Sequence, residues 1–230
     1  MTAVPAEDVE GARIGAAVSG TIERVFAAVS VVHTAALRFL EDGGSDRAFG
    51  ARVAELLREP GQIAVGLGLV TAPLPERDLQ LHWWQADPAV DRVVQLDPDL
   101  RPASLGYYDY TATDWFEVPR RSGRRHVVGP YVDVHGTGRY LLTLTGPVVA
   151  GGEFLGVVGA DVPVSGFEAH LLGVLGSPAG TFVLVNDEDR VVLSTSPRRL
   201  VGELVRPDAP LPQPGTPIAG VPWRLHVAGA

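Results

Sequence analysis

The sequence predicts an α+β fold, in which a long helix precedes an antiparallel sheet and a short strand-rich tail closes the chain. Three observations predict it. Apolar residues recur at three- and four-residue steps through residues 14–40, as they do on one face of a helix. Short β-rich segments bounded by Pro, Gly or Asp follow from residue 63 onward. A further helical segment at residues 163–176 separates the sheet from the tail.

Two helices are predicted at the N-terminal end. The first carries its apolar stripe from Ile14 to Leu40 and stops at the Glu-Asp-Gly-Gly run of residues 41–44. Ser45 can cap the second helix, because its hydroxyl can accept from a free amide of the first turn. The second helix ends at Pro60-Gly61, and its predicted buried face consists of Phe49, Val53, Leu56 and Leu57.

The strands are predicted from β-rich runs between turn-forming residues. The segment 107–119, rich in aromatic residues, is predicted to be a loop with a short helix near Trp115. An Ala-Gly-Gly turn joins two strands as a hairpin, and Asn186–Asp189 forms a second turn in the tail. The expected strands are 63–71, 79–85, 90–96, 131–135, 139–149, 153–162, two runs that flank the second turn, and 221–229.

Composition excludes several classes of function. A net charge of -8 argues against binding to nucleic acid or to an anionic membrane, because both carry negative charge. Without cysteine the chain has no disulfide framework and no thiolate metal site, and it carries no hydrolase, phosphate-loop or zinc-protease motif. No signal peptide and no membrane-spanning run are recognised, so the chain is expected to be cytoplasmic, or extracytoplasmic if it belongs to a longer receptor.

Four segments resemble motifs of the Cache domain, the PAS-like sensor module of bacterial receptors. "YYDYTATDWF" resembles the family's Tyr-Asp-x-x-x-Arg-x-Trp-Tyr segment, and "GPYVD" its Pro-Tyr-x-Asp element. "LTGPVVAGGEFLGVVGADV" resembles its glycine-rich hairpin, and "TFVLVNDEDRVVLSTSPRRLVG" the hairpin that opens its second module. The resemblance implies a PAS-like antiparallel sheet at residues 61–178, a helical segment at 1–60, and a reduced second module or extra strands at 179–230.

The resemblance also implies a small ligand, held between the sheet and the loops over one face. In family members that bind amino acids, an Arg of the first motif grips the ligand carboxylate, whereas aromatic residues and the hairpin Asp receive its ammonium group. In this chain Phe116 replaces a usual Tyr, and Thr113 stands where the Arg is expected. The ligand-binding residues implied by the resemblance are Tyr108, Thr113, Trp115, Phe116, Tyr131, Asp133 and Asp161.

The change at Thr113 bears on the choice of ligand. Arg pairs bidentately with a carboxylate, whereas Thr offers a single neutral hydroxyl. Losing a charged hydrogen bond costs about 1.5–3 kcal/mol, so an α-amino acid should bind weakly unless another arginine substitutes. Aromatic faces and carboxylates suit an amine-like ligand, and a small polar ligand is the alternative. The neighbouring candidates for a substitute are Arg120, Arg121, Arg124, Arg125 and Arg139.

Other interpretations of these residues stay open. The aromatic residues can be ordinary core, and Asp161 can end a strand or cap the next helix. Tyr107 and Tyr110 alternate with Tyr108 and are expected to face elsewhere. One of Trp83 and Trp84 is expected to face the ligand. Asp133 and His135 could hold a metal only with a third ligand such as His126, so no metal and no cofactor are expected.

The sequence therefore predicts a non-enzymatic sensor domain that binds a small amine-like or polar molecule. Ligand binding would shift a conformational equilibrium that the long helix or a homodimer interface transmits to an unknown output partner. Two alternatives remain: a dimerisation module without ligand, and a small hydrolytic enzyme that uses Asp133, His135 and Asp161 around a bound water.

Overall fold

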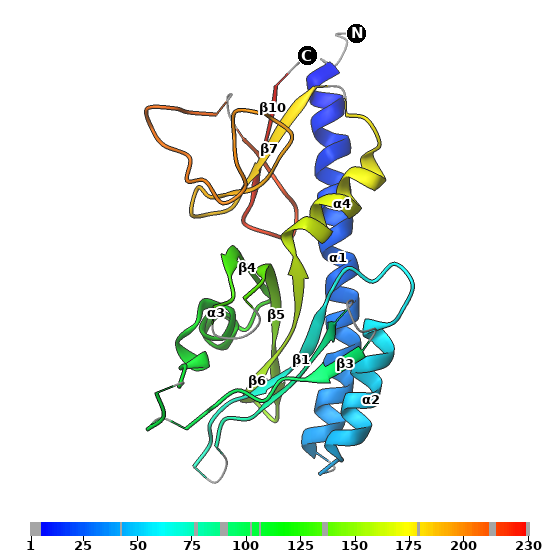
Figure 1. The fold of residues 1–230 in the computed structure, drawn as a ribbon, viewed down its shortest axis with the longest axis vertical. Coiled ribbons are helices and arrows are strands. Elements are labelled where there is room, and N and C mark those ends of the chain that lie inside the picture. The colour runs from blue at the N-terminus through cyan, green and yellow to red at the C-terminus, as the bar shows by residue number, and fades with distance from the viewer. Residues whose placement is uncertain are drawn as a thin grey trace. The chain divides into compact units, whose positions relative to one another are not determined.

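The computed structural model describes residues 6–41, 43–75, 78–87, 92–101, 103–105, 107–134, 138–178, 180–211 and 215–228. The chain divides into two compact units, whose elements are labelled in Figure 1. The larger unit consists of Val25–Val128 and Val132–Pro163. The smaller unit consists of Met1–Arg24, Gly129–Tyr131 and Val164–Ala230.

A six-stranded sheet with the order β3-β2-β1-β6-β5-β4 forms the larger unit (Figure 1). The pairings β1–β2, β1–β6, β2–β3 and β5–β6 are antiparallel. The sheet and the helices around it confirm the predicted α+β class. The strands are β1 (Gly66–Thr71), β2 (Leu81–Asp87), β3 (Arg92–Gln95), β4 (His126–Val132), β5 (Tyr140–Ala150) and β6 (Glu153–Pro163).

The hairpin between β5 and β6 sets the register at the middle of the sheet. Gly151 and Gly152 form its two-residue turn with φ angles of 58° and 84°. Two positive φ angles in succession are the signature of a tight hairpin turn whose twist matches that of the flanking strands. The turn confirms the predicted hairpin, and its register places Thr143 opposite Asp161.

One face of the sheet packs against the C-terminal part of α1 (Ala6–Glu41) and against α2 (Asp46–Leu57). The Phe39 ring of α1 lies 5.3 Å from the Phe49 ring of α2 and 4.8 Å from the His82 ring of β2. As predicted, Ser45 caps α2, where its hydroxyl oxygen accepts from the amide of Ala48 at 3.2 Å. The buried face of α2 also matches the prediction.

The opposite face of the sheet is covered by the segment rich in aromatic residues, as a 3₁₀ turn, η1 (Tyr110–Ala112), and a helix, α3 (Asp114–Ser122). The Thr145 hydroxyl of β5 donates to the backbone carbonyl of Trp115 at 2.7 Å, which ties α3 to the sheet. Gly123 ends α3 with φ 65°, a left-handed conformation that favours glycine. The short helix predicted near Trp115 is confirmed.

The smaller unit is built on a four-stranded sheet with the order β8-β7-β10-β9. Phe167 of the adjoining helix α4 (Val164–Leu175) packs edge-on against Trp223, with ring centroids 6.0 Å apart. Asn186 shapes the predicted turn, because its Oδ1 accepts from the amides of Glu188 and Arg190. The strands are β7 (Thr181–Val185), β8 (Val191–Ser194), β9 (Thr216–Pro217) and β10 (Arg224–Ala228).

Two predictions need correction. The extended piece expected at 131–135 is the end of a longer strand, since β4 begins at His126 and ends at Val132. The expectation that no run could span a membrane is also wrong by length and composition, because the 34 residues Asp8–Glu41 form a helix long and apolar enough to do so. The core helix of a soluble protein passes the same test.

Candidate functional site

The candidate site is centred on Asp161, an acidic side chain that is only 7% exposed within the sheet. Thr143 of β5 and Gly66 of β1 lie opposite Asp161 on either side. The Thr143 hydroxyl donates to Oδ1 at 2.7 Å, and the indole N–H of Trp83 donates to Oδ2 at 3.1 Å. Each carboxylate oxygen therefore has one hydrogen bond and keeps a lone pair for another donor.

Glycines on the neighbouring strands make room for the Trp83 indole. A Cβ atom at Gly66 would lie 2.8 Å from Nε1 of Trp83 and 2.9 Å from Oδ2 of Asp161. A Cβ atom at Gly159 would lie 3.2 Å from the far end of the same ring and 2.7 Å from Cγ2 of Thr145. Both positions are too crowded for a side chain, so the two glycines let the indole lie flat along the sheet and reach Asp161.

The ionisation of Asp161 reflects its burial. Loss of hydration raises the pKa of Asp161 to about 6, and the negative charge of Asp133 raises it as well. Hydrogen bonds from Thr143 and Trp83 favour the ionised form and oppose this rise, and the nearby Gln85 side chain lowers the pKa of Asp161 as well. Within the described parts of the chain, no Lys, Arg or His pairs with Asp161. At neutral pH the site therefore presents a buried negative charge for which the described residues supply no counter-ion.

Gln85 adds an unused hydrogen-bond donor to the same face of the sheet. It stands next to Gly66 across the β1–β2 pairing, two residues beyond Trp83, and only 6% of it is exposed. Its side chain lowers the pKa of Asp161, which indicates that it faces the carboxylate. Nevertheless, its Nε2 has no hydrogen-bond partner among the described residues. A buried donor without a partner costs about 1–3 kcal/mol, so an acceptor group on a ligand would be stabilised here.

An aromatic cluster lies over this face of the sheet. The Tyr110 ring is 5.1 Å from the Tyr108 ring and 6.0 Å from the Trp115 ring. Burial and the charge of Asp133 raise the pKa of Tyr110 to about 12, and the same two causes raise the pKa of Tyr108. Because Asp133 acts on both tyrosines and on Asp161, these side chains share one electrostatic environment.

The position of Tyr110 corrects one prediction. Tyr110 was expected to face away from Tyr108, but strand alternation supports this only for Tyr107, because residues i and i+2 of an extended segment point to the same side. The chain instead turns at η1, where Oδ1 of Asp109 accepts from the amide of Thr111 at 3.0 Å. This turn brings the Tyr110 ring edge-on against Tyr108. Sequence reasoning missed the capping Asp, although Asp is a common residue at such turns.

Thr113 and Phe116 differ in what they offer a ligand. The Thr113 hydroxyl donates to the backbone carbonyl of Tyr110 at 2.7 Å, so its proton is already used within the protein. Phe116 is completely buried, with its ring edge-on to Phe154 at 5.6 Å and in one apolar cluster with Trp83. Trp115 is only partly buried and packs against this cluster. Trp115 therefore keeps some exposed surface, whereas Phe116 is enclosed in the core.

The remaining predicted residues lie at the end of β4, as Tyr131 does, or just after it. Alternate residues of a strand point to the same side, so Asp133 would align with Tyr131 if the strand continued. It does not, because β4 ends at Val132. Tyr131 belongs to the smaller unit. His135 lies outside the described residues. Within the described residues no group of three His, Asp or Glu side chains could hold a metal ion.

Three of the arginines that could substitute for the Arg expected at Thr113 have described contacts. Arg120 pairs with Glu117 at 2.8 Å, and the Arg125 guanidinium lies 4.4 Å above the centre of the Phe26 ring. Arg139 donates to the backbone carbonyl of Ala86 at 3.4 Å, next to Gln85 on β2. Arg139 is thus the arginine whose described contact lies on a strand of the site.

Sequence reasoning left the choice between Trp83 and Trp84 open and missed Thr143 and Gln85. Trp83 faces Asp161, whereas Trp84 packs against Phe49 of α2 with ring centroids 5.5 Å apart. A signal for Thr143 was present, because Thr143 and Thr145 alternate with leucines in an otherwise apolar strand. Gln85 carried no such signal, because its role depends on the pairing of β1 with β2 and β6.

Comparisons with known proteins agree with this architecture. Residues 88–168 match the family model of the first PDC sensor domain of methyl-accepting chemotaxis protein-like receptors. Methyl-accepting chemotaxis protein TlpQ of Pseudomonas aeruginosa is 29% identical over 117 residues, which cover 44% of this chain. The same match covers 16% of TlpQ, so the chain corresponds to a small part of that receptor.

Three solved structures share the fold over nearly the whole chain. Methyl-accepting Chemotaxis protein X is 13% identical with a TM-score of 0.73, and the match covers 97% of this chain and 96% of that one. The ligand-binding domain of the P. aeruginosa amino acid chemoreceptor PctC, in complex with GABA, is 20% identical with a TM-score of 0.56 and 97% coverage of both chains. The extracellular domain of the histidine kinase soHK1S-Z6 is 11% identical with a TM-score of 0.63, covering 96% and 91%.

The family match covers the middle of the chain, and the fold match extends over nearly all of it. Residues 88–168 thus match a PDC sensor-domain model, which confirms the resemblance indicated by the four motifs. Relatives of the chain include ligand-binding domains of chemoreceptors.

Proposed function

We propose that the chain is a non-enzymatic sensor module that binds a small ligand carrying an ammonium group at Asp161. One observation carries the proposal: Asp161 is a buried carboxylate that has hydrogen-bond donors but no cationic partner among the described residues. A buried charge without a counter-charge is costly, and a ligand ammonium would supply that charge.

The surrounding groups support the same choice of ligand. Trp115, Tyr108 and Tyr110 offer aromatic faces, which attract a cation with about 0.5–2 kcal/mol. Asp133 adds negative charge that acts on the same residues. The Nε2 of Gln85 offers a single neutral donor for a hydroxyl or carbonyl oxygen of the ligand. The proposed pocket combines these groups with Asp161, whereas Thr113 and Phe116 support its aromatic residues from within the protein. The predicted role of Tyr131 stays a prediction.

The ligand is proposed to be an amine rather than an α-amino acid. PctC is in complex with GABA, which carries both an ammonium and a carboxylate group. In this chain Thr113 replaces the family Arg and uses its hydroxyl proton on Tyr110. A ligand carboxylate would therefore lack its usual bidentate partner, unless Arg139 turns toward it.

The signal would pass out of the domain as a shift in conformational populations. A ligand that binds one state better moves the equilibrium toward that state. We propose that α1 or a homodimer interface transmits the change to the signalling part of a receptor. The expectation of a cytoplasmic protein gains no support, and we propose instead that the domain works outside the membrane, as in the extracellular domain of soHK1S-Z6.

The proposal is tested by calorimetric titration of propylamine, tetramethylammonium, GABA and L-alanine into the wild-type protein and the Asp161→Asn variant. Asp187→Asn is the matched control, because Asp187 is exposed in the turn between β7 and β8. We expect the amines to bind the wild-type and control proteins, and Asp161→Asn to lose at least about tenfold in affinity. Equal affinity for amines in all three proteins would refute the assignment of Asp161.

A second variant tests the choice between amines and amino acids. Thr113→Arg restores the guanidinium that the family uses for a carboxylate. We expect it to bind GABA or L-alanine at least about tenfold more tightly than the wild-type protein does. If the wild-type protein already prefers these zwitterions and loses that preference in Arg139→Ala, the ligand is an amino acid and Arg139 is its anchor.

A further inference from the structure

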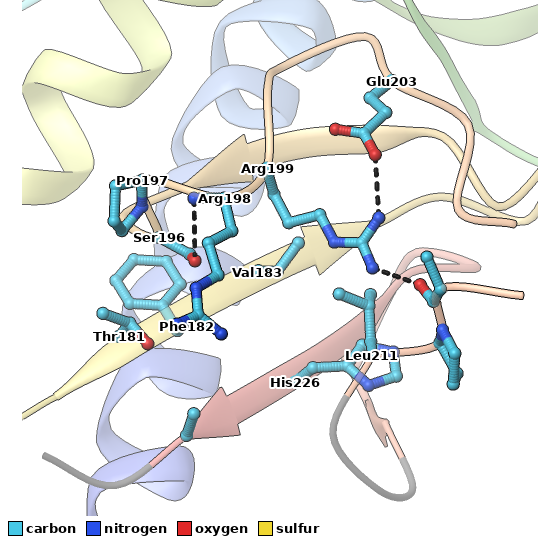
Figure 2. A pocket seen from close by; sticks show the side chains of 13 residues that line it. Thr181, Phe182, Val183, Ser196, Pro197, Arg198, Arg199, Glu203, Leu211 and His226 are labelled. Atoms are coloured by element: carbon cyan, nitrogen blue, oxygen red, sulfur yellow. Dashed lines mark hydrogen bonds and ion pairs between the residues drawn. The ribbon is translucent and has the colours of Figure 1, made fainter.

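The smaller unit contains a second hollow that the proposed function does not use. Its volume is about 850 Å³, and it lies between β7, β10 and the loop that follows β8 (Figure 2). A volume of this size falls in the range of sites that hold small organic ligands. The described residues that line the hollow all belong to residues 181–228 and so to the smaller unit.

Two neighbouring arginines line the hollow and have different environments. Arg199 donates to Glu203 at 2.8 Å and to the backbone carbonyl of Ala209, and its side chain is only 14% exposed. Glu203 also accepts from the amide of Leu200 at 3.0 Å, and these bonds lower its pKa. Arg199 is therefore a neutralised and fixed part of the wall.

Arg198 leaves a positive charge without a partner in this hollow. Its backbone amide donates to the Ser196 hydroxyl at 3.3 Å, which holds the loop. Its guanidinium makes no hydrogen bond or ion pair with any residue that the structure describes. Figure 2 shows its side chain extending from the loop over β7, beside Phe182. In a chain with a net charge of -8, an unpaired arginine at a hollow favours an anionic ligand.

The rest of the wall is mostly apolar. Phe182 and Val183 of β7 are buried beneath the hollow, and Leu211 and Pro197 lie at its sides. Thr181 adds a hydroxyl at the edge nearest Arg198 in Figure 2. One unpaired cation next to apolar side chains suits a ligand with one negative charge and a short hydrocarbon tail.

We propose that this hollow is a second ligand site, in which Arg198 binds the carboxylate of a small monocarboxylate whose hydrocarbon part packs against Leu211 and Pro197. The site is independent of Asp161, because all its lining residues lie in the smaller unit. It makes the chain a domain with two sites of opposite charge preference: a cation at Asp161 and an anion at Arg198.

The test is calorimetric titration of butyrate at fixed ionic strength, with the uncharged amide butyramide as the matched ligand. We expect the wild-type protein to bind butyrate at millimolar or lower concentration and butyramide at least about tenfold more weakly. Arg198→Gln should weaken butyrate at least about tenfold, and Arg198→Lys should retain part of the affinity because it keeps the charge. Arg47→Gln is the control, since Arg47 is an exposed residue of α2 in the larger unit.

The possible results separate this site from the first one. Butyrate binding that persists in Asp161→Asn and disappears in Arg198→Gln supports the second site, whatever the amines do. Butyrate binding that is lost in Asp161→Asn and kept in Arg198→Gln overturns it. Equal losses in Arg198→Gln and Arg47→Gln show a nonspecific effect of net charge and also overturn it, as does a wild-type protein that binds no butyrate.

Discussion

The two faces of the six-stranded sheet are both buried, but their chemistry differs. Leucines dominate the face toward α1 and α2, where Leu67, Leu69 and Leu144 are at most 1% exposed. The face toward α3 carries Gln85, Thr143, Thr145 and Asp161, none of them more than 7% exposed. The same strands supply both sets, because successive residues of a strand point to opposite faces.

This difference indicates which face maintains the fold and which face is the candidate for ligand binding. Buried apolar side chains stabilise the folded state without needing partners. Buried polar groups need partners, and Asp161 and Gln85 each keep unused bonding capacity. Places where a fold departs from the simplest stabilising choice are commonly functional sites, and here they gather on one face.

The largest effect on stability is expected from the leucine face. Leu144→Ala should lower the free energy of unfolding by about 2–5 kcal/mol, because it removes buried hydrocarbon and leaves a cavity. Urea denaturation measures the loss. Amine affinity, measured below the unfolding transition, should change little, because Leu144 points away from Asp161. A loss of amine affinity as large as that of Asp161→Asn would show that the leucine face also contributes to ligand binding.

An intermediate effect is expected from pH. Because burial raises the pKa of Asp161 to about 6, the folded protein binds a proton between about pH 4 and pH 6 that the unfolded chain has released. The stabilisation from this group is therefore complete below about pH 4 and is lost as the pH rises through about 6. The expected loss in the ligand-free protein is roughly 3 kcal/mol.

Denaturation at several pH values measures this effect, with Asp161→Asn as the variant that lacks the titrating group. The difference in unfolding free energy between variant and wild type should grow in favour of the variant from pH 4 to pH 6 and then level off. Amine affinity should follow the opposite course and weaken as the pH falls below about 6, because protonated Asp161 carries no charge. If the difference in unfolding free energy between variant and wild type stays constant over this pH range, Asp161 does not have a raised pKa.

The smallest effect on stability is expected from the two threonines of β5. Both lie on the face toward α3, but only Thr143 bonds to Asp161. Thr143→Val and Thr145→Val should each lower the free energy of unfolding by about 1 kcal/mol, because each loses one hydrogen bond. The Thr143 hydroxyl favours ionised Asp161, so only Thr143→Val should raise the pKa of Asp161 further. The pH range over which stability is lost should then move to higher pH. Thr145 bonds to the Trp115 carbonyl, so Thr145→Val should leave the pH dependence in place.

Local sequence patterns were sufficient for most of the fold. The three- and four-residue apolar steps, the Ser45 cap and the Gly151-Gly152 turn each act over a few neighbouring residues, so the sequence shows them directly. The start of β4 was missed, because His126–Gly129 carry no alternation that distinguishes them from the preceding loop. The proposed boundaries at residues 60 and 178 stay predictions.

The candidate site was only partly accessible from the sequence. The family motifs pointed to Asp161, Tyr108 and Trp115, and the structure adds Trp83, Gln85 and Thr143 around the same carboxylate. Thr143 and Asp161 are 18 residues apart, and Trp83 and Asp161 are 78 apart. Such contacts depend on strand pairing, which no local pattern specifies.

By itself the sequence determined the helices, the hairpin, the absence of thiol chemistry and the resemblance to the Cache family, because these depend on residue type and short spacing. Only the tertiary structure decided that Trp83 rather than Trp84 meets Asp161, that Tyr110 joins the aromatic cluster, and that the Arg198 side chain lies at a hollow without a partner among the described residues. The reason is physical: burial, ionisation and the pairing of polar groups depend on which distant segments come together, and that is set when the strands pair and the helices cover them.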